Sequence, residues 1–349
     1  MSNIYVNARF LAQNVTGVQR YAAEICKKLQ KLDPAIIFLA PQDIIDHKTS
    51  KQLNAIIIGN NTGTIWEQLD LPLYLKKKGN PLLLNLCNTA PLIYKNCVVT
   101  VHDMSYKTNP KWFSKSFYYW YNFLIPQLIK NARKVITVSN SSKADIIKYL
   151  NTDSSKIEVV YNSTNLKPGL QIPSEAHGEY ILTVSSIDPR KNLANLIIAY
   201  QKLKQNLQLI VVGVKNKNFS EALSPEIYSN PSITFKGYVT DEKLTQLYTG
   251  AKVFVYPSFY EGFGLPPLEA MGLGCPVIVS DIPVLREICS EAAVYIQPQS
   301  IDDIAEKINT VITNEKLRNE LIASGIKNAS RFSWELSANK ILILLNEFN

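Results

Sequence analysis

Short apolar runs rich in Ile and Val recur along the whole chain, and a stretch of helical periodicity follows each run. The first half has seven runs, at residues 3–9, 36–41, 55–59, 82–87, 97–103, 134–140 and 157–162. The second half has six, at residues 180–186, 208–213, 233–237, 253–258, 276–281 and 293–298. The runs are continuously apolar, which is typical of parallel strands covered on both faces. The pattern therefore predicts an α/β protein with two doubly wound parallel sheets.

The division into domains follows from the same pattern. The segment 163–178 is rich in turn formers and has no periodicity, so we expect the interdomain linker there. This gives one domain over residues 1–165 and a second over 166–332, and 349 residues suit two domains of roughly 150. A last helical run at about 334–348 has Ser333 as its expected N-cap, and we expect residues 333–349 to return to the first domain.

Ligands of open α/β sheets bind at the carboxyl ends of the strands. The richest such segment is VFVYPSFYEGFGLPPLEAMGLGCPVIVSD, where a strand is followed by Gly262 and Gly264 and by a helix expected to begin near Pro266 or Pro267. Both glycines allow a positive φ and a close approach of the backbone to a ligand, and the free N–H groups of the helix favour an anion. The segment therefore predicts a phosphate-binding site.

Glu261 and Glu269 lie eight residues apart in this segment, one in the loop and one a turn into the helix. This spacing lets them reach two parts of one ligand. The alternative is that Glu269 complements the helix dipole and Glu261 is a solvated loop charge.

Arg190 and Lys191 stand at the expected start of a helix in TVSSIDPRKNLANLIIAY. Two cations there oppose the helix dipole, so we expect an anionic group to compensate them, and a diphosphate would do so. The alternative is that both are ordinary surface charges.

The segment EGFGLPPLEAM, followed by GCPVIVSDIPVLREI, resembles the donor site of retaining glycosyltransferases of the GT-B fold, family 4. The resemblance covers most of the second half and returns at several points of the first. It implies two Rossmann-like domains that hold a nucleotide-sugar in the cleft between them without a metal. It also implies that Glu269 binds the nucleotide ribose and that Glu261 contacts hydroxyls of the transferred sugar.

The resemblance assigns further residues to the donor. Lys191 of the PRKN-like motif would bind the diphosphate, with Arg190 beside it, because this chain has Ser186 where many members have an arginine. The backbone of Val239 would border the base. The donor-binding set is completed by residues of two loops, Gly17, Gly262, Phe263, Gly264 and Leu265.

Two features of the first domain point to the same chemistry. Gly17 lies in the turn NVTGVQRY, with Thr16 as a candidate cap, and this turn resembles the family loop that faces the donor phosphates or the acceptor. His102 follows the buried run VVTV, and a histidine at a strand end is a candidate functional residue, although a lone histidine is often structural. In the family this histidine lies against the transferred sugar, which makes His102 a catalytic candidate with Glu261 and Lys191.

The net charge of +8 is unevenly distributed. Residues 1–165 carry 20 Lys and Arg against 10 Asp and Glu, whereas residues 166–349 carry 17 against 19. With Lys76, Lys77 and Lys78 and the aromatic segment 111–124, the first domain could face an anionic membrane. Segment 111–124 could equally be a core helix with one exposed edge, and the charge could be a solvated surface.

The composition narrows the remaining classes. No signal peptide and no apolar stretch of about 18 residues is present, so we expect a cytoplasmic protein, peripheral to the membrane. Neither a zinc site nor a disulfide framework is expected, because the five cysteines form no CxxC pair and the three histidines are scattered. No DxD-like acidic pair stands where a metal–diphosphate bridge would need it, so no metal cofactor is expected.

The sequence thus predicts a retaining glycosyltransferase that moves a sugar to a glycan or undecaprenyl-diphosphate-linked acceptor in surface polysaccharide or lipopolysaccharide assembly. The motif looks most like O-antigen mannosyltransferases, which favours GDP-mannose, with UDP- and dTDP-sugars as alternatives. Front-face attack by the acceptor is favoured, and double displacement stays open. An NAD-dependent dehydrogenase would need GxGxxG after the first strand, where the chain has NVTGVQR. A nucleic-acid-binding protein would explain the basic half, but no nucleic-acid motif is present, so we expect no nucleic-acid partner.

Overall fold

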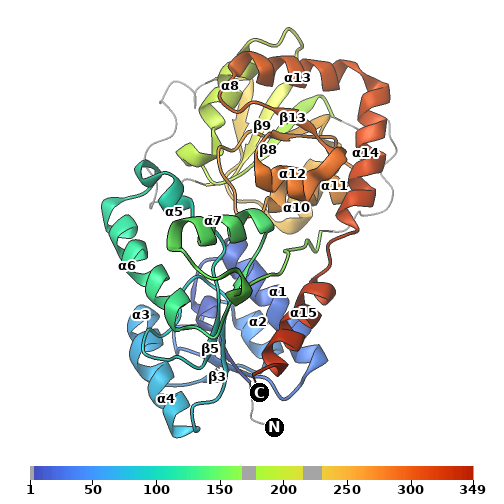
Figure 1. The fold of residues 1–349 in the computed structure, drawn as a ribbon. Helices are drawn as coiled ribbons and strands as arrows, with labels where there is room; N and C mark the ends of the chain where they lie inside the picture. The colour runs from blue at the N-terminus through green and yellow to red at the C-terminus, as the bar shows by residue number, and fades with distance from the viewer. Residues whose placement is uncertain (1–3, 167–177, 215–229, 349) are drawn as a thin grey trace. The chain divides into compact units, whose positions relative to one another are not determined.

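The computed structural model describes residues 4–166, 178–214 and 230–348. Residues 167–177 of the expected linker, with His177, lie outside the described residues. The chain divides into two compact units (Figure 1). Unit 1 comprises Met1–Lys107, Tyr119–Asn162 and Ser333–Asn349, and unit 2 comprises Thr108–Tyr118 and Ser163–Phe332.

The sheet of unit 1 has seven parallel strands in the order β3-β2-β1-β4-β5-β6-β7. Its strands are β1 (Tyr5–Asn7), β2 (Ile37–Ala40), β3 (Ile56–Ile57), β4 (Leu83–Asn85), β5 (Cys97–Thr100), β6 (Lys134–Thr137) and β7 (Ile157–Val159). The chain reverses its direction of travel across the sheet after β3, so β1 lies between β2 and β4. Each strand falls inside a predicted apolar run.

The helices of unit 1 include a long first helix whose predicted cap is confirmed. Thr16 accepts a hydrogen bond from the Val18 N–H and forms a capping box with Gln19. The helices are α1 (Gly17–Leu32), α2 (His47–Gln52), α3 (Gly63–Ile65), α4 (Leu71–Lys77), α5 (Ser105–Thr108), α6 (Lys115–Asn131), α7 (Asn140–Leu150) and α15 (Trp334–Asn346); α5 and α6 each extend into unit 2 at one end. A π-helical turn, η2 (Trp66–Asp70), joins α3 to α4, and short 3₁₀ turns occur at η1 (Arg9–Ala12), η3 (Pro110–Trp112, in unit 2) and η4 (Ser154–Lys156).

The C-terminal helix α15 belongs to unit 1, where it packs against α1 (Figure 1). Ser333 caps α15, as the sequence predicts, by accepting from the Glu335 N–H. The contact is aromatic at its centre, with the Tyr21 and Trp334 rings 6.0 Å apart. Helix α15 therefore adds buried side chains, such as Trp334 and Ile341, to the core of the first unit.

The sheet of unit 2 has six parallel strands in the order β10-β9-β8-β11-β12-β13. They are β8 (Tyr180–Val184), β9 (Gln208–Val212), β10 (Ile233–Phe235), β11 (Val253–Tyr256), β12 (Val277–Ser280) and β13 (Val294–Ile296). Each again falls inside a predicted run, so the prediction of two doubly wound parallel sheets is confirmed.

Helices cover both faces of this sheet, as the alternating side chains of β11 show. Val253 and Val255 join the core formed with α8 and α13, whereas Phe254 packs edge-on against Tyr248 of α10 on the other side. The helical segments are η6 (Pro189–Lys191), α8 (Leu193–Gln201), α10 (Asp241–Gly250), α11 (Leu265–Gly272), α12 (Pro283–Cys289), η7 (Ser290–Ala292), α13 (Ile301–Thr313) and α14 (Glu315–Ala329). Burial on both faces is the physical reason for the continuously apolar strands.

No helix within the described ranges is long and apolar enough to cross a membrane.

Candidate functional site

The loop between β11 and α11 has the form that the sequence predicts for an anion-binding site. Helix α11 begins at Leu265, next to the predicted prolines, and its N-cap Gly264 has a φ of 103°. This φ favours glycine, and a Cβ on Gly264 would also press on the Leu285 Cδ2 atom at 2.7 Å. Of the two glycines that allow a positive φ, Gly264 adopts one and Gly262 does not.

The central feature of unit 2 is a buried ion pair between Lys191 and Glu261. The Lys191 Nζ atom lies 2.6 Å from the Glu261 Oε1 atom and donates a second hydrogen bond to the Tyr256 hydroxyl at 3.0 Å. The two side chains of the pair are only 9% and 7% exposed. The end of β11, the β11–α11 loop and the η6 turn therefore meet at this ion pair.

The charged groups around this ion pair shift the pKa values of Glu261 and Tyr256 in opposite directions. Burial alone would raise the pKa of Glu261, but Lys191 and then Arg190 outweigh it and hold that pKa below the usual 4.5. Burial, with the Glu261 carboxylate, raises the pKa of Tyr256 well above its usual range. Glu261 is therefore an anion and Tyr256 a neutral phenol at neutral pH.

The anionic groups that the sequence predicts beside Arg190 and Lys191 include carboxylates of the protein itself. Asp188, which is fully buried, accepts from the Arg190 N–H at 3.1 Å and lies 3.6 Å from the Arg190 Nε atom. Glu261 does the same for Lys191. The alternative of ordinary surface charges is wrong for Lys191, which is 8% exposed.

Glu269 lies within α11 and is 7% exposed. The Tyr248 hydroxyl, from α10, donates a hydrogen bond to the Glu269 Oε2 atom at 3.1 Å. This carboxylate is therefore buried and held by a specific hydrogen-bond donor. A surface residue that only complements the helix dipole would need neither.

Of the other predicted donor residues of unit 2, Phe263 and Leu265 lie between the two carboxylates in the chain and Val239 precedes them. Phe263 is 4% exposed and packs edge-on against Phe332 with ring centroids 5.7 Å apart. Leu265 opens α11, and Val239 lies half-buried between β10 and the Thr240 cap of α10, which was predicted and is confirmed.

Two residues of unit 2 escaped the sequence reasoning. At Gly213, with a φ of 140°, a Cβ would lie 1.8 Å from the Ser185 carbonyl oxygen, so glycine is required where β9 ends beside β8. Asn192, in the left-handed region, donates from Nδ2 to the Pro257 carbonyl at 3.0 Å and so ties η6 to the end of β11. A single glycine directly after an apolar run was the only signal for the first.

In unit 1, His102 follows β5 and is 7% exposed. Its Nε2 atom lies 2.9 Å from the Leu86 carbonyl oxygen, which can only accept, so Nε2 carries the proton and Nδ1 is left as an acceptor. Burial lowers the pKa of His102 below its usual 6.5, although the Leu86 carbonyl and Asp103 act the other way. The ring packs edge-on against Tyr21 at 4.9 Å. His102 is thus a neutral imidazole in a fixed orientation.

Gly17 is the first residue of α1, directly after the Thr16 cap. It belongs to unit 1 with His102, whereas Lys191, Glu261 and Glu269 belong to unit 2.

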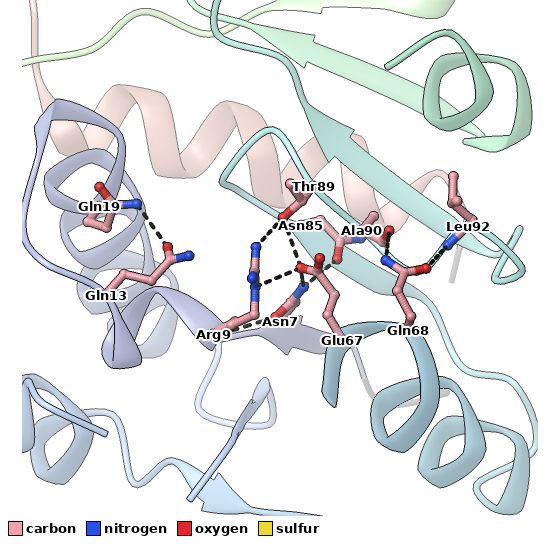
Figure 2. A network of polar contacts seen from close by, with 10 residues as sticks. All are labelled: Asn7, Arg9, Gln13, Gln19, Glu67, Gln68, Asn85, Thr89, Ala90 and Leu92. Carbon is pink, nitrogen blue, oxygen red and sulfur yellow. Dashed lines mark hydrogen bonds and ion pairs between the residues drawn. The ribbon is translucent and has the colours of Figure 1, made fainter. Parts of the chain in front are cut away.

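A second polar network in unit 1 was not anticipated (Figure 2). It joins Arg9, Glu67 and Thr89 to Asn7 and Asn85, which are the last residues of β1 and β4. A polar residue inside each of two apolar runs was its only signal in the sequence.

Within the described part of the chain, no three His, Cys, Asp or Glu residues are grouped so that they could hold a metal ion.

The two parallel-sheet units have the GT-B architecture, as do the solved structures of similar fold. Sucrose-phosphate synthase from Thermosynechococcus elongatus has a similar fold, with a TM-score of 0.78, 21% identity and 99% of each chain covered. Anabaena HepE, solved with UDP and glucose, gives a TM-score of 0.76 at 18% identity, covering 99% of this chain and 100% of that one.

The sequence relatives define the family. Residues 15–167 match the model described as Glycosyltransferase Family 4, and residues 171–328 match Glycosyl transferases group 1. The Salmonella typhimurium protein named O-antigen chain mannosyltransferase RfbU is 35% identical over 84% of this chain and 86% of its own. The Escherichia coli O-antigen chain mannosyltransferase B is 31% identical over 69% and 68%. The chain therefore belongs to the group 1, family 4 glycosyltransferases and is an enzyme of that class, as the sequence predicts.

Proposed function

We propose that this glycosyltransferase transfers mannose from GDP-mannose, with retention of configuration, to a glycan or undecaprenyl-diphosphate-linked acceptor in surface polysaccharide assembly. The relatives named O-antigen mannosyltransferases support the sugar and the pathway class. The observation that carries the donor-site proposal is the buried Lys191–Glu261 pair. Charged side chains are buried only where other charged or polar groups, of the protein or of a ligand, stabilise them.

Each donor-site carboxylate has its own role in this proposal. Glu269, held by Tyr248, accepts hydrogen bonds from the nucleotide ribose, and Glu261 contacts hydroxyls of the sugar. Lys191 then shares its ammonium between Glu261 and the donor diphosphate. The residues of unit 2 that border the donor in this proposal are Arg190, Val239, Gly262, Phe263, Gly264 and Leu265.

The leaving nucleoside diphosphate gains negative charge as the glycosidic bond breaks. Lys191, Arg190 and the N-terminus of α11 supply fixed positive charge and N–H donors for that group. We propose that no metal is required, because these groups already provide the charge stabilisation.

Front-face attack by the acceptor hydroxyl suits the electrostatics of Glu261. A carboxylate whose pKa is lowered by a paired ammonium is a weak nucleophile. His102, with its Nδ1 lone pair free of a proton, acts on the transferred sugar in this scheme.

We also propose that unit 1 meets an anionic membrane. On α6, Leu124, Ile125, Leu128 and Ile129 are buried, whereas Tyr119, Trp120 and Phe123 are 69%, 42% and 56% exposed, which supports a membrane-facing role for the first half of this helix. Interfacial aromatics of this kind are typical of membrane-facing helices.

A second apolar stripe supports the same proposal. Ile65, Leu69 and Leu73 follow one another at intervals of four along the continuous helical run α3–η2–α4 and are 59%, 53% and 58% exposed. The exposed Lys76–Lys78 cluster ends this run. An apolar stripe that ends in cations is complementary to a bilayer with anionic headgroups.

The donor is tested with purified enzyme and a panel of GDP-, UDP- and dTDP-sugars. GDP-mannose should be hydrolysed fastest without acceptor and should raise the melting temperature most. Preferential turnover of a UDP- or dTDP-sugar would replace the donor while leaving the glycosyltransferase class untouched.

A further inference from the structure

Arg9 and Glu67 form a buried ion pair that the donor site does not use (Figure 2). The Arg9 Nε atom lies 3.1 Å from the Glu67 Oε1 atom, and the side chains are 12% and 2% exposed. The same oxygen accepts from the Asn7 amide and from the Thr89 hydroxyl, each at 2.9 Å. Arg9 also donates to the Thr89 Oγ1 atom at 2.8 Å.

Thr89 connects this pair to the loop that follows β4. Its hydroxyl bridges Arg9 and Glu67, while the Asn7 amide holds Asn85, four residues earlier, at 3.0 Å. The charges of the pair act on the loop itself. Burial raises the pKa of Cys87 to about 12, with Arg9 lowering it and Glu67 raising it.

The same loop holds His102 at two points. The Asn88 Oδ1 atom accepts from the His102 backbone N–H at 2.8 Å, and the Leu86 carbonyl accepts from the ring Nε2–H at 2.9 Å. Asn88 sits in the left-handed region with a φ of 59° and donates its own N–H to the Thr100 carbonyl at 3.1 Å. These two contacts link the orientation of His102 to the position of this loop.

Stability alone gives a buried ion pair no advantage over apolar residues of similar volume. A charged network at the carboxyl edge of a sheet therefore calls for a role in geometry. The π-helical turn that presents Glu67 is itself a form found frequently at functional sites.

We propose that Arg9 and Glu67, acting through Thr89 and the loop 85–89, are positioning residues that hold His102 in its orientation and in the Nε2–H tautomer. The proposal deepens the proposed function, since it rests on His102 acting in sugar transfer. The pair itself touches no reacting atom in this scheme.

The test uses the full-length enzyme and three variants. Thr89→Val removes the bridging hydroxyl at nearly constant volume and leaves the ion pair, Thr89→Ser keeps the hydroxyl, and Glu67→Gln keeps an acceptor oxygen but removes the charge. Nitrogen-15 NMR at pH 7.5 reports the tautomer of each histidine, and the chain has only three. A His102→Gln variant assigns the His102 signals.

In the wild type and in Thr89→Ser, His102 should show a protonated Nε2 and an unprotonated Nδ1. Thr89→Val and Glu67→Gln should show a mixture of tautomers. The kcat for transfer should fall by up to about 10²-fold, as for a displaced catalytic group, with KM for the donor unchanged. Circular dichroism shows whether each variant is folded. If Glu67→Gln does not fold, the test rests on Thr89→Val.

An unchanged His102 spectrum in Thr89→Val would overturn the positioning role, whatever the activity. A changed spectrum with unchanged kcat in both Thr89→Val and His102→Gln would support positioning and refute the part of the proposed function that uses His102.

Discussion

Removal of either charge of the Lys191–Glu261 pair should cost more stability than removal of both. We consider Lys191→Met, Glu261→Gln and the double variant. Lys191→Met leaves a buried carboxylate with Arg190 as its remaining cation, and Glu261→Gln leaves a buried ammonium that retains the Tyr256 hydroxyl and ring.

The magnitude follows from the burial of the pair. Both side chains are at least nine-tenths buried, so little solvent screening applies. Removal of one partner of such a pair costs about 3–5 kcal/mol because the other charge is left uncompensated, whereas apolar residues of similar volume in place of both are often neutral in stability. Each single variant should therefore lose about 3–5 kcal/mol, and the double variant, which leaves no buried charge of the pair but keeps a polar amide at position 261, should lose less than either single variant.

The assay is urea unfolding of the nucleotide-free enzyme, followed by circular dichroism because two compact units need not unfold in one step. A second measurement varies the pH. Because the folded pKa of Glu261 lies below 4.5, its contribution is fully present above pH 4.5 and is lost as the pH falls through the folded pKa. Glu261→Gln should lack this part of the acid transition.

A double variant as unstable as the sum of the two single variants would refute the reasoning, because the charges would then not be coupled. The double variant should remain inactive in transfer. Full activity would show that neither residue belongs to the donor machinery.

Glu269→Ala should weaken binding of free GDP in calorimetry, whereas Glu261→Ala should keep that affinity and lose transfer; equal loss in both contradicts the division of roles. Transfer should survive EDTA, and restoration by Mg²⁺ or Mn²⁺ after its loss would show that a metal is required. Burial lowers the pKa of His102, so the unfolded chain takes up a proton at this residue at a higher pH than the folded chain does. The free energy of unfolding should therefore fall as the pH drops below 6.5, and less steeply in His102→Gln. Identical pH dependence in the two proteins would refute this assignment. Anionic vesicles should sediment the enzyme at 0.1 M salt and release it at about 1 M, where the Debye length is ~3 Å, and the Leu69→Glu variant or charge reversal at Lys76–Lys78 should abolish binding at about 1 kcal/mol per lysine; vesicles without effect at low salt would leave the basic face as a solubilising surface.

The sequence alone determined the local structure of this protein. The apolar runs located every described strand, because a strand buried on both faces has to be apolar throughout. Thr16, Thr240 and Ser333 were recognisable as caps, because a cap acts on N–H groups two or three residues away. The motif with Glu261 and Glu269 was likewise readable, because its spacing lies within one turn and one helix.

The tertiary structure alone decided which charges meet. Lys191 and Glu261 are 70 residues apart in the chain. The sequence predicts a ligand contact for each of them, and the fold shows that they also contact one another. Asn7 and Glu67, 60 residues apart, become neighbours only because β1 lies beside β4 and the π-helical turn packs over their ends. Pairing at such separations depends on strand order and helix packing, which no local pattern encodes, and it sets the electrostatics on which the chemistry depends.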